Sequence, residues 1–206
     1  MNKKRIVLAT RNLGKTRELN ALLAPLDIEV SSLAAFPEIG EIEENGATFE
    51  ENALIKARYV ARETGLPALA DDSGILVEAL GDAPGVYSAR YGDDWEKIDG
   101  ETRDERNIRK LLAETANMSN RKCEYVTVMA AVLPSGEEIT SRGTWEGSLL
   151  SEKRGTNGFG YDPVFLDPEI GKTAAELSDA EKNGRSHRGK AIRSMIEKLP
   201  AFLNRA

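Results

Sequence analysis

KRIVLATRNLGKTRELNALL, residues 4–23, is the stretch that decides the fold. Its first part, residues 4–9, is a short apolar run rich in branched side chains, which predicts a buried strand. From Gly14 onward, leucines recur at helical spacing, at Leu19, Leu22, Leu23 and Leu26. The stretch therefore predicts a strand, a turn and a helix, which is the opening unit of an α/β protein.

The rest of the chain supplies the other elements. Thr48 and Glu51 form a capping-box pattern, which predicts the start of a helix that Gly65 and Pro67 end. A sharp turn is expected at residues 71–74, between two short strand segments. The remaining predicted strands are residues 28–31, 69–71, 75–77, 123–133, 138–150 and 164–166, and the remaining helices are 103–115 and about 187–203.

The order of these elements predicts the architecture. Early strand-helix order, followed by a long hairpin around Pro134-Ser135-Gly136, is typical of an α/β protein with a long, mixed, twisted sheet and flanking helices. Clefts are expected at the strand ends. The chain has 206 residues and 40% apolar content, which is enough for one well-filled core, so we expect one domain over residues 1–206.

Composition excludes several classes of function. The chain carries 28 basic and 34 acidic residues, and a net charge of −6 counts against nucleic acid as a partner. We expect no membrane association, because no apolar run is long enough for a signal-peptide core or a membrane span. The single cysteine, Cys123, cannot form an internal disulfide and suits a reducing cytoplasm. One histidine and one cysteine exclude the usual zinc sites, so a bound metal would be a hard ion held by oxygen.

The first candidate site lies at the junction of the first strand and helix. Gly14-Lys15-Thr16 resembles the end of a P-loop, but that motif requires glycine at position 9, where this chain has Ala9. What remains is a helix N-terminus with backbone N–H groups and polar side chains that can hold a phosphate chain. The alternative is an ordinary turn in which Lys15 is solvated.

Carboxylates supply the second and third candidates. Asp71 and Asp72 lie between apolar segments, and adjacent residues of a strand point to opposite faces, so one of them is expected to face a cleft. A carboxylate there can bind Mg²⁺ or deprotonate a water, although an Asx-type turn is the alternative. Glu41, Glu43 and Glu44 add oxygen ligands or form a solvated loop.

The helix that follows the acidic cluster also carries polar candidates. Asn52 and Lys56 are four residues apart and hence share one face of that helix. Lys56 could contact phosphate, or it could simply pair with Glu51 or Asn52.

The last two candidates lie near the C-terminus. Residues 155–163 contain three glycines, which allow close backbone approach, and two aromatic side chains that either stack on a base or pack into the core. Residues 182–190 contain the only histidine, His187, and the neighbouring Lys182, Arg185 and Arg188 favour contact with an anion or a nucleotide. A catalytic triad with Ser186 is disfavoured, because adjacent residues rarely face each other.

Taken together, these segments resemble the inosine triphosphate pyrophosphatase family, which hydrolyses non-canonical purine nucleoside triphosphates. The likeness runs from Thr10 to the last helix, and the joint order of its motifs makes coincidence implausible. The motifs are Thr10-x-Asn12-x-x-Lys15, residues 43–57 (EENGATFEENALIKA), Ala70-Asp71-Asp72-Ser73-Gly74, Pro84-Gly85-Val86-Tyr87-Ser88-Ala89-Arg90, residues 158–163 (GFGYDP) and Ser186-His187-Arg188-Gly189.

The resemblance implies a fold, a reaction and partners. The fold would be a mixed sheet with two lobes around a central cleft, and the protein would be a cytoplasmic homodimer. With Mg²⁺ as cofactor, it would convert ITP, dITP or XTP into the monophosphate and pyrophosphate. A P-loop-like NTPase or kinase and a catalytically silent nucleotide-binding module are the alternatives, and the missing first glycine counts against the former.

The resemblance also implies roles for individual residues. Asp72 would be the catalytic proton acceptor and a Mg²⁺ ligand, Glu43 a further metal ligand, and Ser73 a neighbour of the substrate. The triphosphate would be bound by Thr10, Arg11, Asn12, Leu13, Gly14 and Lys15. The base and sugar would be framed by Phe159, Gly160, Tyr161 and Asp162, with Lys182 in contact with substrate and with His187 and Arg188 at the oxo edge of the purine. Arg11 stands where some relatives have Gly or Ser.

Overall fold

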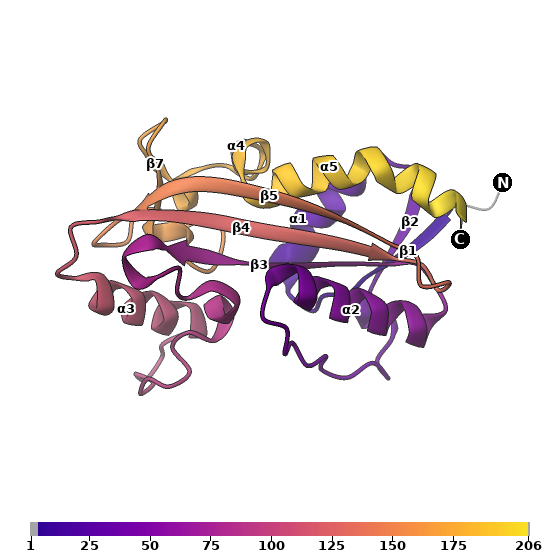
Figure 1. Cartoon of the computed structure of the whole chain (residues 1–206). Coiled ribbons are helices and arrows are strands. Elements are labelled where there is room, and N and C mark those ends of the chain that lie inside the picture. Colours follow the sequence, from indigo (N-terminus) through magenta and orange to yellow (C-terminus); the bar gives the residue numbers. More distant parts are fainter. Residues whose placement is uncertain (1–3, 206) are drawn as a thin grey trace. The chain divides into compact units, whose positions relative to one another are not determined.

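A computed structural model describes residues 4–205 of the chain, and its centre is a seven-stranded sheet (Figure 1). The strand order is β2-β1-β3-β4-β5-β6-β7. The strands are β1 Lys4–Leu8, β2 Ile28–Ser32, β3 Ala68–Val77, β4 Lys122–Val132, β5 Glu138–Leu149, β6 Phe165–Asp167 and β7 Lys172–Thr173. The α-helices are α1 Leu13–Leu23, α2 Phe49–Thr64, α3 Arg103–Thr115, α4 Asp179–Arg185 and α5 His187–Phe202, and a short 3₁₀ helix, η3, spans Gly85–Arg90.

The sheet is mixed. Strand β1 pairs in parallel with both β2 and β3, whereas β6 pairs antiparallel with β5 and β7. Strands β4 and β5 are neighbours joined by residues 133–137. This connection is too short for a parallel crossover, so the two strands form an antiparallel hairpin. The predicted α/β class, mixed sheet and hairpin are therefore confirmed.

The chain divides into two compact units. The first unit comprises the described residues up to Asp72, Thr127–Gly143, and the described residues from His187 onward. The second unit comprises Ser73–Val126 and Thr144–Ser186. Strands β3, β4 and β5 each contribute residues to both units. A single domain with two lobes around a cleft stays a prediction.

The core of the first unit lies between its strands and helices α1 and α5. Buried side chains from these elements form one cluster, which includes Ile6, Leu19, Met129, Ile192 and Phe202. Strand β5 and α5 touch through backbone at Gly143. A Cβ added there would lie 2.1 Å from the carbonyl oxygen of His187 and 2.6 Å from the amide nitrogen of Ala191, so only glycine permits this approach.

The core of the second unit is built around an aromatic cluster. The ring centroid of Phe165 lies 4.3 Å from that of Tyr125 and 4.8 Å from that of Trp145, and all three side chains are buried. Cys123 is buried in the same cluster. Trp95, the other tryptophan of the chain, stacks against the guanidinium of Arg109 at 5.0 Å.

One sequence prediction was wrong, and two elements were missed. Strand β3 runs without interruption from Ala68 to Val77, so residues 71–74 form no sharp turn. The strand continues because both of its aspartates are bonded by side chains of surrounding helices, which replaces the local Asx-type hydrogen bonds of a turn. Helix α4 was missed, although Ser178 and Glu181 form a capping box at its start. The short strand β7 was missed as well.

Candidate functional site

The N-terminus of α1 is capped by side chains of the preceding turn. Asn12 Oδ1 accepts the Lys15 backbone N–H at 3.1 Å, and Thr10 Oγ1 accepts the Asn12 N–H at 3.2 Å. The N–H groups of Leu13 and Gly14 belong to the first turn, where a helix offers no acceptor. Leu13 is 79% exposed, so this helix end is open to an incoming anion.

Asp71 binds two of the predicted substrate-binding residues. Its carboxylate is fully buried and lies 3.0 Å from Lys15 Nζ and 3.3 Å from Arg188 Nε. Arg188 also contacts Glu18 at 2.5 Å. Burial alone would raise the pKa of Asp71, but the adjacent Lys15 and Arg188 outweigh it and hold that pKa well below its usual range. The sequence motifs placed Lys15 at the triphosphate and Arg188 at the purine, and they did not indicate that Asp71 pairs with both.

Asp72 turns to the other side of β3 and contacts α2. Its Oδ2 accepts Asn52 Nδ2 at 3.1 Å, and its Oδ1 lies 3.6 Å from Lys56 Nζ. The different partners of Asp71 and Asp72 confirm that adjacent aspartates point to opposite faces. Burial raises the pKa of Asp72, although Lys56 opposes this shift, so its carboxylate is a better proton acceptor than an ordinary aspartate.

Two carboxylates gather around the ammonium group of Lys56. Glu44 Oε2 lies 2.8 Å from Lys56 Nζ, on which Asp72 also converges. Mg²⁺ is usually bound through one or two carboxylates together with substrate phosphates, so this donor set fits a magnesium ion. Among residues 4–205, no group of three or more potential metal-ligating side chains forms a closed protein site. Glu43, the predicted ligand, is exposed, whereas Glu44 is the acidic-loop residue that shares Lys56 with Asp72.

The predicted base-framing residues form a separate group in the second unit. Asp162 is buried and lies 2.7 Å from Lys182 Nζ, and it accepts the Phe159 backbone N–H at 2.9 Å and the Tyr125 hydroxyl at 3.3 Å. Lys182 Nζ lies 4.9 Å from the Phe159 ring centroid. Gly158 has φ +78°, and a Cβ there would lie 2.0 Å from Asp162, so a tight turn at Gly158 brings these groups together.

The remaining predicted residues are distributed between the units. Thr10 to Lys15, Glu43, Asp72, His187 and Arg188 lie in the first unit, and Ser73, Phe159 to Asp162 and Lys182 lie in the second. His187 is buried and is the first residue of α5. Arg11 donates a hydrogen bond to the carbonyl oxygen of Ile39, which gives it a structural contact within the first unit.

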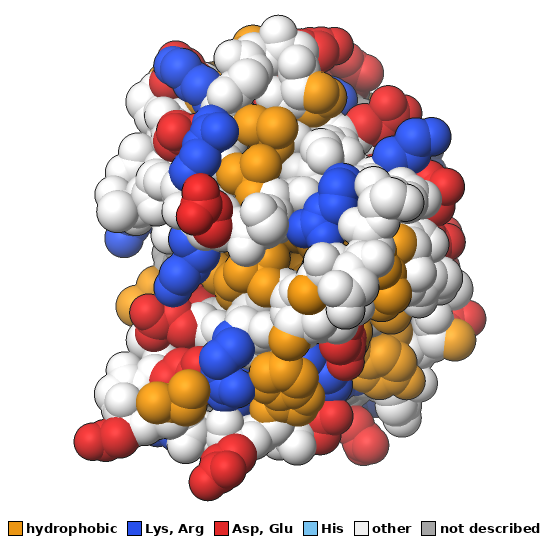
Figure 2. Space-filling view, turned by 90° about the vertical axis from the view of Figure 1, so that its left-hand side faces the viewer, with side chains coloured by type: hydrophobic (Ala, Val, Ile, Leu, Met, Phe, Trp, Pro, Cys, Tyr) orange, Lys and Arg blue, Asp and Glu red, His pale blue; other side chains and the backbone are white. Residues whose placement is uncertain are grey.

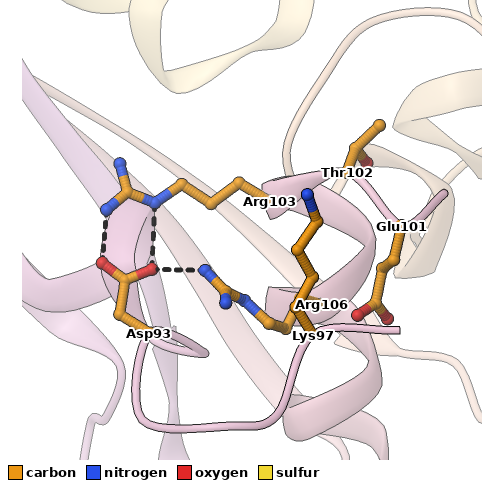
Figure 3. A pocket seen from close by; sticks show the side chains of 6 residues that line it. All are labelled: Asp93, Lys97, Glu101, Thr102, Arg103 and Arg106. Carbon is orange, nitrogen blue, oxygen red and sulfur yellow. Dashed lines mark hydrogen bonds and ion pairs between the residues drawn. The ribbon is translucent and has the colours of Figure 1, made fainter. Parts of the chain in front are cut away.

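A pocket of about 460 Å³ in the second unit is lined by none of these residues (Figure 3). It is lined by Asp93, Lys97, Glu101, Thr102, Arg103 and Arg106. Asp93 pairs with Arg103 and Arg106, so the acidic and basic side chains that line the pocket largely neutralise one another. The face drawn in Figure 2 likewise carries interspersed acidic and basic side chains, which does not favour binding to a nucleic-acid backbone.

Comparison with known proteins decides the family. Residues 6–198 match the Ham1 family. The chain belongs to the Ham1 family. Among relatives, the dITP/XTP pyrophosphatase of Nitratidesulfovibrio vulgaris is 53% identical over 98% of this chain and 99% of its own length. The dITP/XTP pyrophosphatase of Symbiobacterium thermophilum is 51% identical, with 98% of each chain covered.

Solved structures of Ham1 proteins have the same fold. The Ham1 protein of Staphylococcus aureus superimposes with a TM-score of 0.83 at 38% identity, covering 96% of this chain and 99% of that one. A HAM1 protein from Coxiella burnetii gives a TM-score of 0.82 at 43% identity, covering 98% and 100%. The family and the fold predicted from the sequence motifs are therefore confirmed. Within residues 4–205, no helix combines the length and apolar composition needed to cross a membrane.

Proposed function

We propose that this Ham1 protein hydrolyses non-canonical purine nucleoside triphosphates, such as ITP, dITP and XTP, to the monophosphate and pyrophosphate. The observation that carries the proposal is its similarity, at 53% and 51% identity over nearly the whole chain, to proteins named dITP/XTP pyrophosphatases. The charged groups around Asp71 and Asp72 and the aromatic group around Phe159 supply chemistry suited to such a substrate.

The first unit would bind the triphosphate and activate water. Lys15 and the N–H groups at the start of α1 offer positive charge and donors to phosphate oxygens. Asp72, whose pKa burial raises, would accept a proton from the attacking water. Lys56 lies beside Asp72 and would stabilise negative charge that develops on the leaving pyrophosphate.

Mg²⁺ is the cofactor that fits this arrangement. Asp72 and Glu44 are the carboxylates that would hold it, and Glu43 remains the ligand predicted from the sequence. When bound, magnesium supplies neutralisation of the phosphate charge and polarises the phosphorus under attack. Lys56 now occupies the position between the two carboxylates, so it would shift toward the phosphates in the loaded enzyme.

The second unit would recognise the base. Phe159 supplies the aromatic surface, because Tyr161 is buried in the core cluster of this unit, and the Asp162–Lys182 pair supplies fixed polar groups beside Phe159. His187 and Arg188 of the first unit would read the 6-oxo group. A site built with donors for an oxo group rejects a 6-amino group because buried donors would then lose their partners. Activity as a homodimer in the cytoplasm completes the proposal; the free, buried thiol of Cys123 is compatible with a reducing compartment.

The deciding experiment measures turnover of ITP, XTP, ATP and GTP with and without Mg²⁺, and separates pyrophosphate from orthophosphate. We expect monophosphate and pyrophosphate from ITP and XTP, much slower turnover of ATP and GTP, and loss of activity after chelation. Formation of ADP and orthophosphate from ATP would instead identify a different NTPase. Complete inactivity with nucleotide binding would identify a silent binding module.

A further inference from the structure

The motif at residues 84–90 has no part in the function proposed above. The residue of interest in this motif is Ser88, which is buried and belongs to η3. Ser88 Oγ accepts the backbone N–H of Ile75 at 2.9 Å and donates to the carbonyl oxygen of Gly85 at 2.6 Å. Ile75 belongs to β3, two residues beyond Ser73. The Ser88 hydroxyl therefore ties η3 to the strand that carries candidate site residues.

The carbonyl group of Ser88 faces the base-framing residues. It accepts the hydroxyl of Tyr161 at 2.8 Å and Asn107 Nδ2 at 3.3 Å. Tyr161 belongs to residues 158–162, which we call the recognition loop. Because Tyr161 and Asn107 are both buried, each of these hydrogen bonds would be costly to leave unmade. Ser88 thus joins two segments: its side chain bonds to β3, and its backbone carbonyl bonds to the recognition loop.

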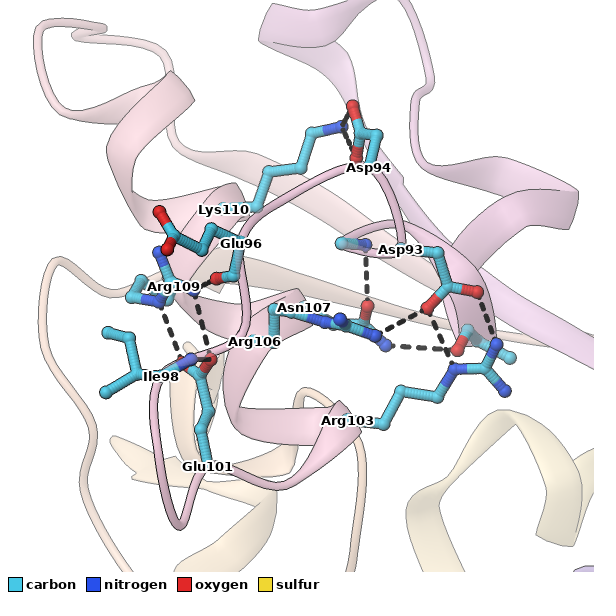
Figure 4. A network of polar contacts seen from close by, with 12 residues as sticks. Asp93, Asp94, Glu96, Ile98, Glu101, Arg103, Arg106, Asn107, Arg109 and Lys110 are labelled. Carbon is cyan, nitrogen blue, oxygen red and sulfur yellow. Dashed lines mark hydrogen bonds and ion pairs between the residues drawn. The ribbon is translucent and has the colours of Figure 1, made fainter.

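Helix α3 provides a second anchor for the same loop. Asp104, in its first turn, accepts the backbone N–H of Gly160 at 2.7 Å. The helix itself is fastened to residues 91–101 by charged side chains, which Figure 4 shows along its length. These contacts are Asp93 with Arg103 and Arg106, Glu101 with Arg109, and Asp94 with Lys110. Asp104 is therefore attached to a helix held at several points.

We propose that Ser88 and Asp104 are positioning residues that fix the recognition loop and thereby determine how tightly the purine base is bound. The inference rests on the proposed function, since it assigns these anchors to the loop that would frame the base. Ser88 acts through Tyr161, and Asp104 acts through the Gly160 amide. Loss of either anchor should therefore weaken substrate binding and leave the chemical step intact.

Ser88→Ala tests the first anchor in a double-mutant cycle with Tyr161→Phe. Ser88→Ala removes the two hydrogen bonds of the hydroxyl, which hold η3 against β3, and Tyr161→Phe removes the bond to the Ser88 carbonyl oxygen. Each single variant should raise KM for ITP about fivefold and change kcat less than twofold. Because both act on the same link, the double variant should also show about a fivefold rise, well short of the product of the two. Ser88→Thr, which keeps the hydroxyl, should restore KM.

Ser141→Ala is the matched control. Ser141 is also buried, and its hydroxyl donates to the carbonyl oxygen of Ala191 at 2.8 Å within the first unit. It should leave KM unchanged and show no coupling to Tyr161→Phe. If Ser88→Ala behaves like Ser141→Ala, or if its effect multiplies with that of Tyr161→Phe, Ser88 does not position the loop.

Asp104 provides a test that does not depend on the folding of a core variant, because the contact it makes is exposed. Asp104→Ala should raise KM for ITP about threefold, whereas Asp104→Asn, which keeps an acceptor oxygen, should stay close to the parent protein. Amide hydrogen exchange at residues 158–162 should be faster in Asp104→Ala than in Asp104→Asn, a readout that needs no activity. Unchanged exchange would overturn the proposal, while a parent protein inactive on ITP would overturn the proposed function alone.

Discussion

The group around Asp71 and Asp72 in the first unit and the recognition loop in the second unit differ in how their charges are balanced. In the first, Lys15, Lys56 and Arg188 are each held by a carboxylate in a largely buried position. In the second, one buried ion pair, Asp162–Lys182, is accompanied by aromatic rings and neutral hydrogen bonds. A triphosphate requires cations that are already in place, whereas a purine base requires shape and oriented donors.

This difference has an energetic consequence. Buried cations must have counter-ions in the free protein, because an unpaired buried charge is strongly unfavourable. Asp71 meets this need for both Lys15 and Arg188. The loop has fewer charges to balance, so its geometry depends on hydrogen bonds to backbone groups. The two regions should therefore respond differently to substitution.

The largest expected effect is a loss of kcat when the proposed catalytic base of the first unit, Asp72, is replaced. Asp72→Asn keeps the size of the side chain but removes the proton acceptor, so kcat on ITP should fall by about a thousandfold. The far-ultraviolet circular dichroism spectrum should be unchanged. Asp99→Asn makes the same change at an exposed position and should keep full activity. A near-normal rate for Asp72→Asn would refute its assignment as the base.

The second test concerns the ion pair of the recognition loop. Lys182→Met leaves Asp162 buried without its cation, so the free energy of unfolding should fall by about 3 kcal/mol. Arg58→Met removes the cation of an exposed pair with Glu138 and should cost less than about 1 kcal/mol. Urea unfolding measures both. Equal losses would mean that burial does not set the strength of these pairs.

Backbone contact in the first unit gives a smaller effect. Gly143→Ala would place a methyl group against backbone atoms of α5 that cannot move aside singly, so we expect a loss of about 2 kcal/mol in the free energy of unfolding. Gly40→Ala is the control, since a Cβ there meets nothing within 4 Å, and it should change stability by less than about 0.5 kcal/mol. A tolerant Gly143→Ala would show that α5 is free to shift away from β5.

The last test measures how fast a thiol reagent labels Cys123 in the second unit. Burial raises the pKa of Cys123 to about 12, so only about one thiol in ten thousand is ionised at pH 8. The folded protein should scarcely react with a thiol reagent at that pH, whereas the urea-unfolded protein should react at the rate of a free cysteine. Raising the pH toward 12 should increase the thiolate fraction and hence the labelling rate of the folded protein. Rapid labelling of the folded protein at pH 8 would contradict the burial of this thiol.

Local patterns in the sequence predicted much of the fold. The capping box at Thr48 and Glu51 located α2, and the bounds predicted for α3, residues 103–115, are those observed. The ordered motifs also identified the family, because their combination across the chain is far more specific than any one of them. These features depend on neighbours a few residues apart, which a single sequence displays directly.

Contacts between distant residues explain what the sequence did not reveal. Asp71 and Arg188 are 117 positions apart, and nothing near Asp71 indicates that its partners make a continuous strand more favourable than a turn. The choice of Glu44 over Glu43 beside Lys56 likewise depends on the path of an irregular loop. Ser88 was present in a matching motif, but its link to Tyr161 spans 73 positions. Only the folded chain brings these groups together.

Both tryptophans of the chain, Trp95 and Trp145, lie in the second unit. Intrinsic tryptophan fluorescence is therefore a reporter for that unit alone, whereas circular dichroism at 222 nm also monitors helices α1, α2 and α5 of the first. If the two signals change together on heating, the units melt as one cooperative system, as expected for a single domain. Separate transitions would assign each melting temperature to its own unit without any added label.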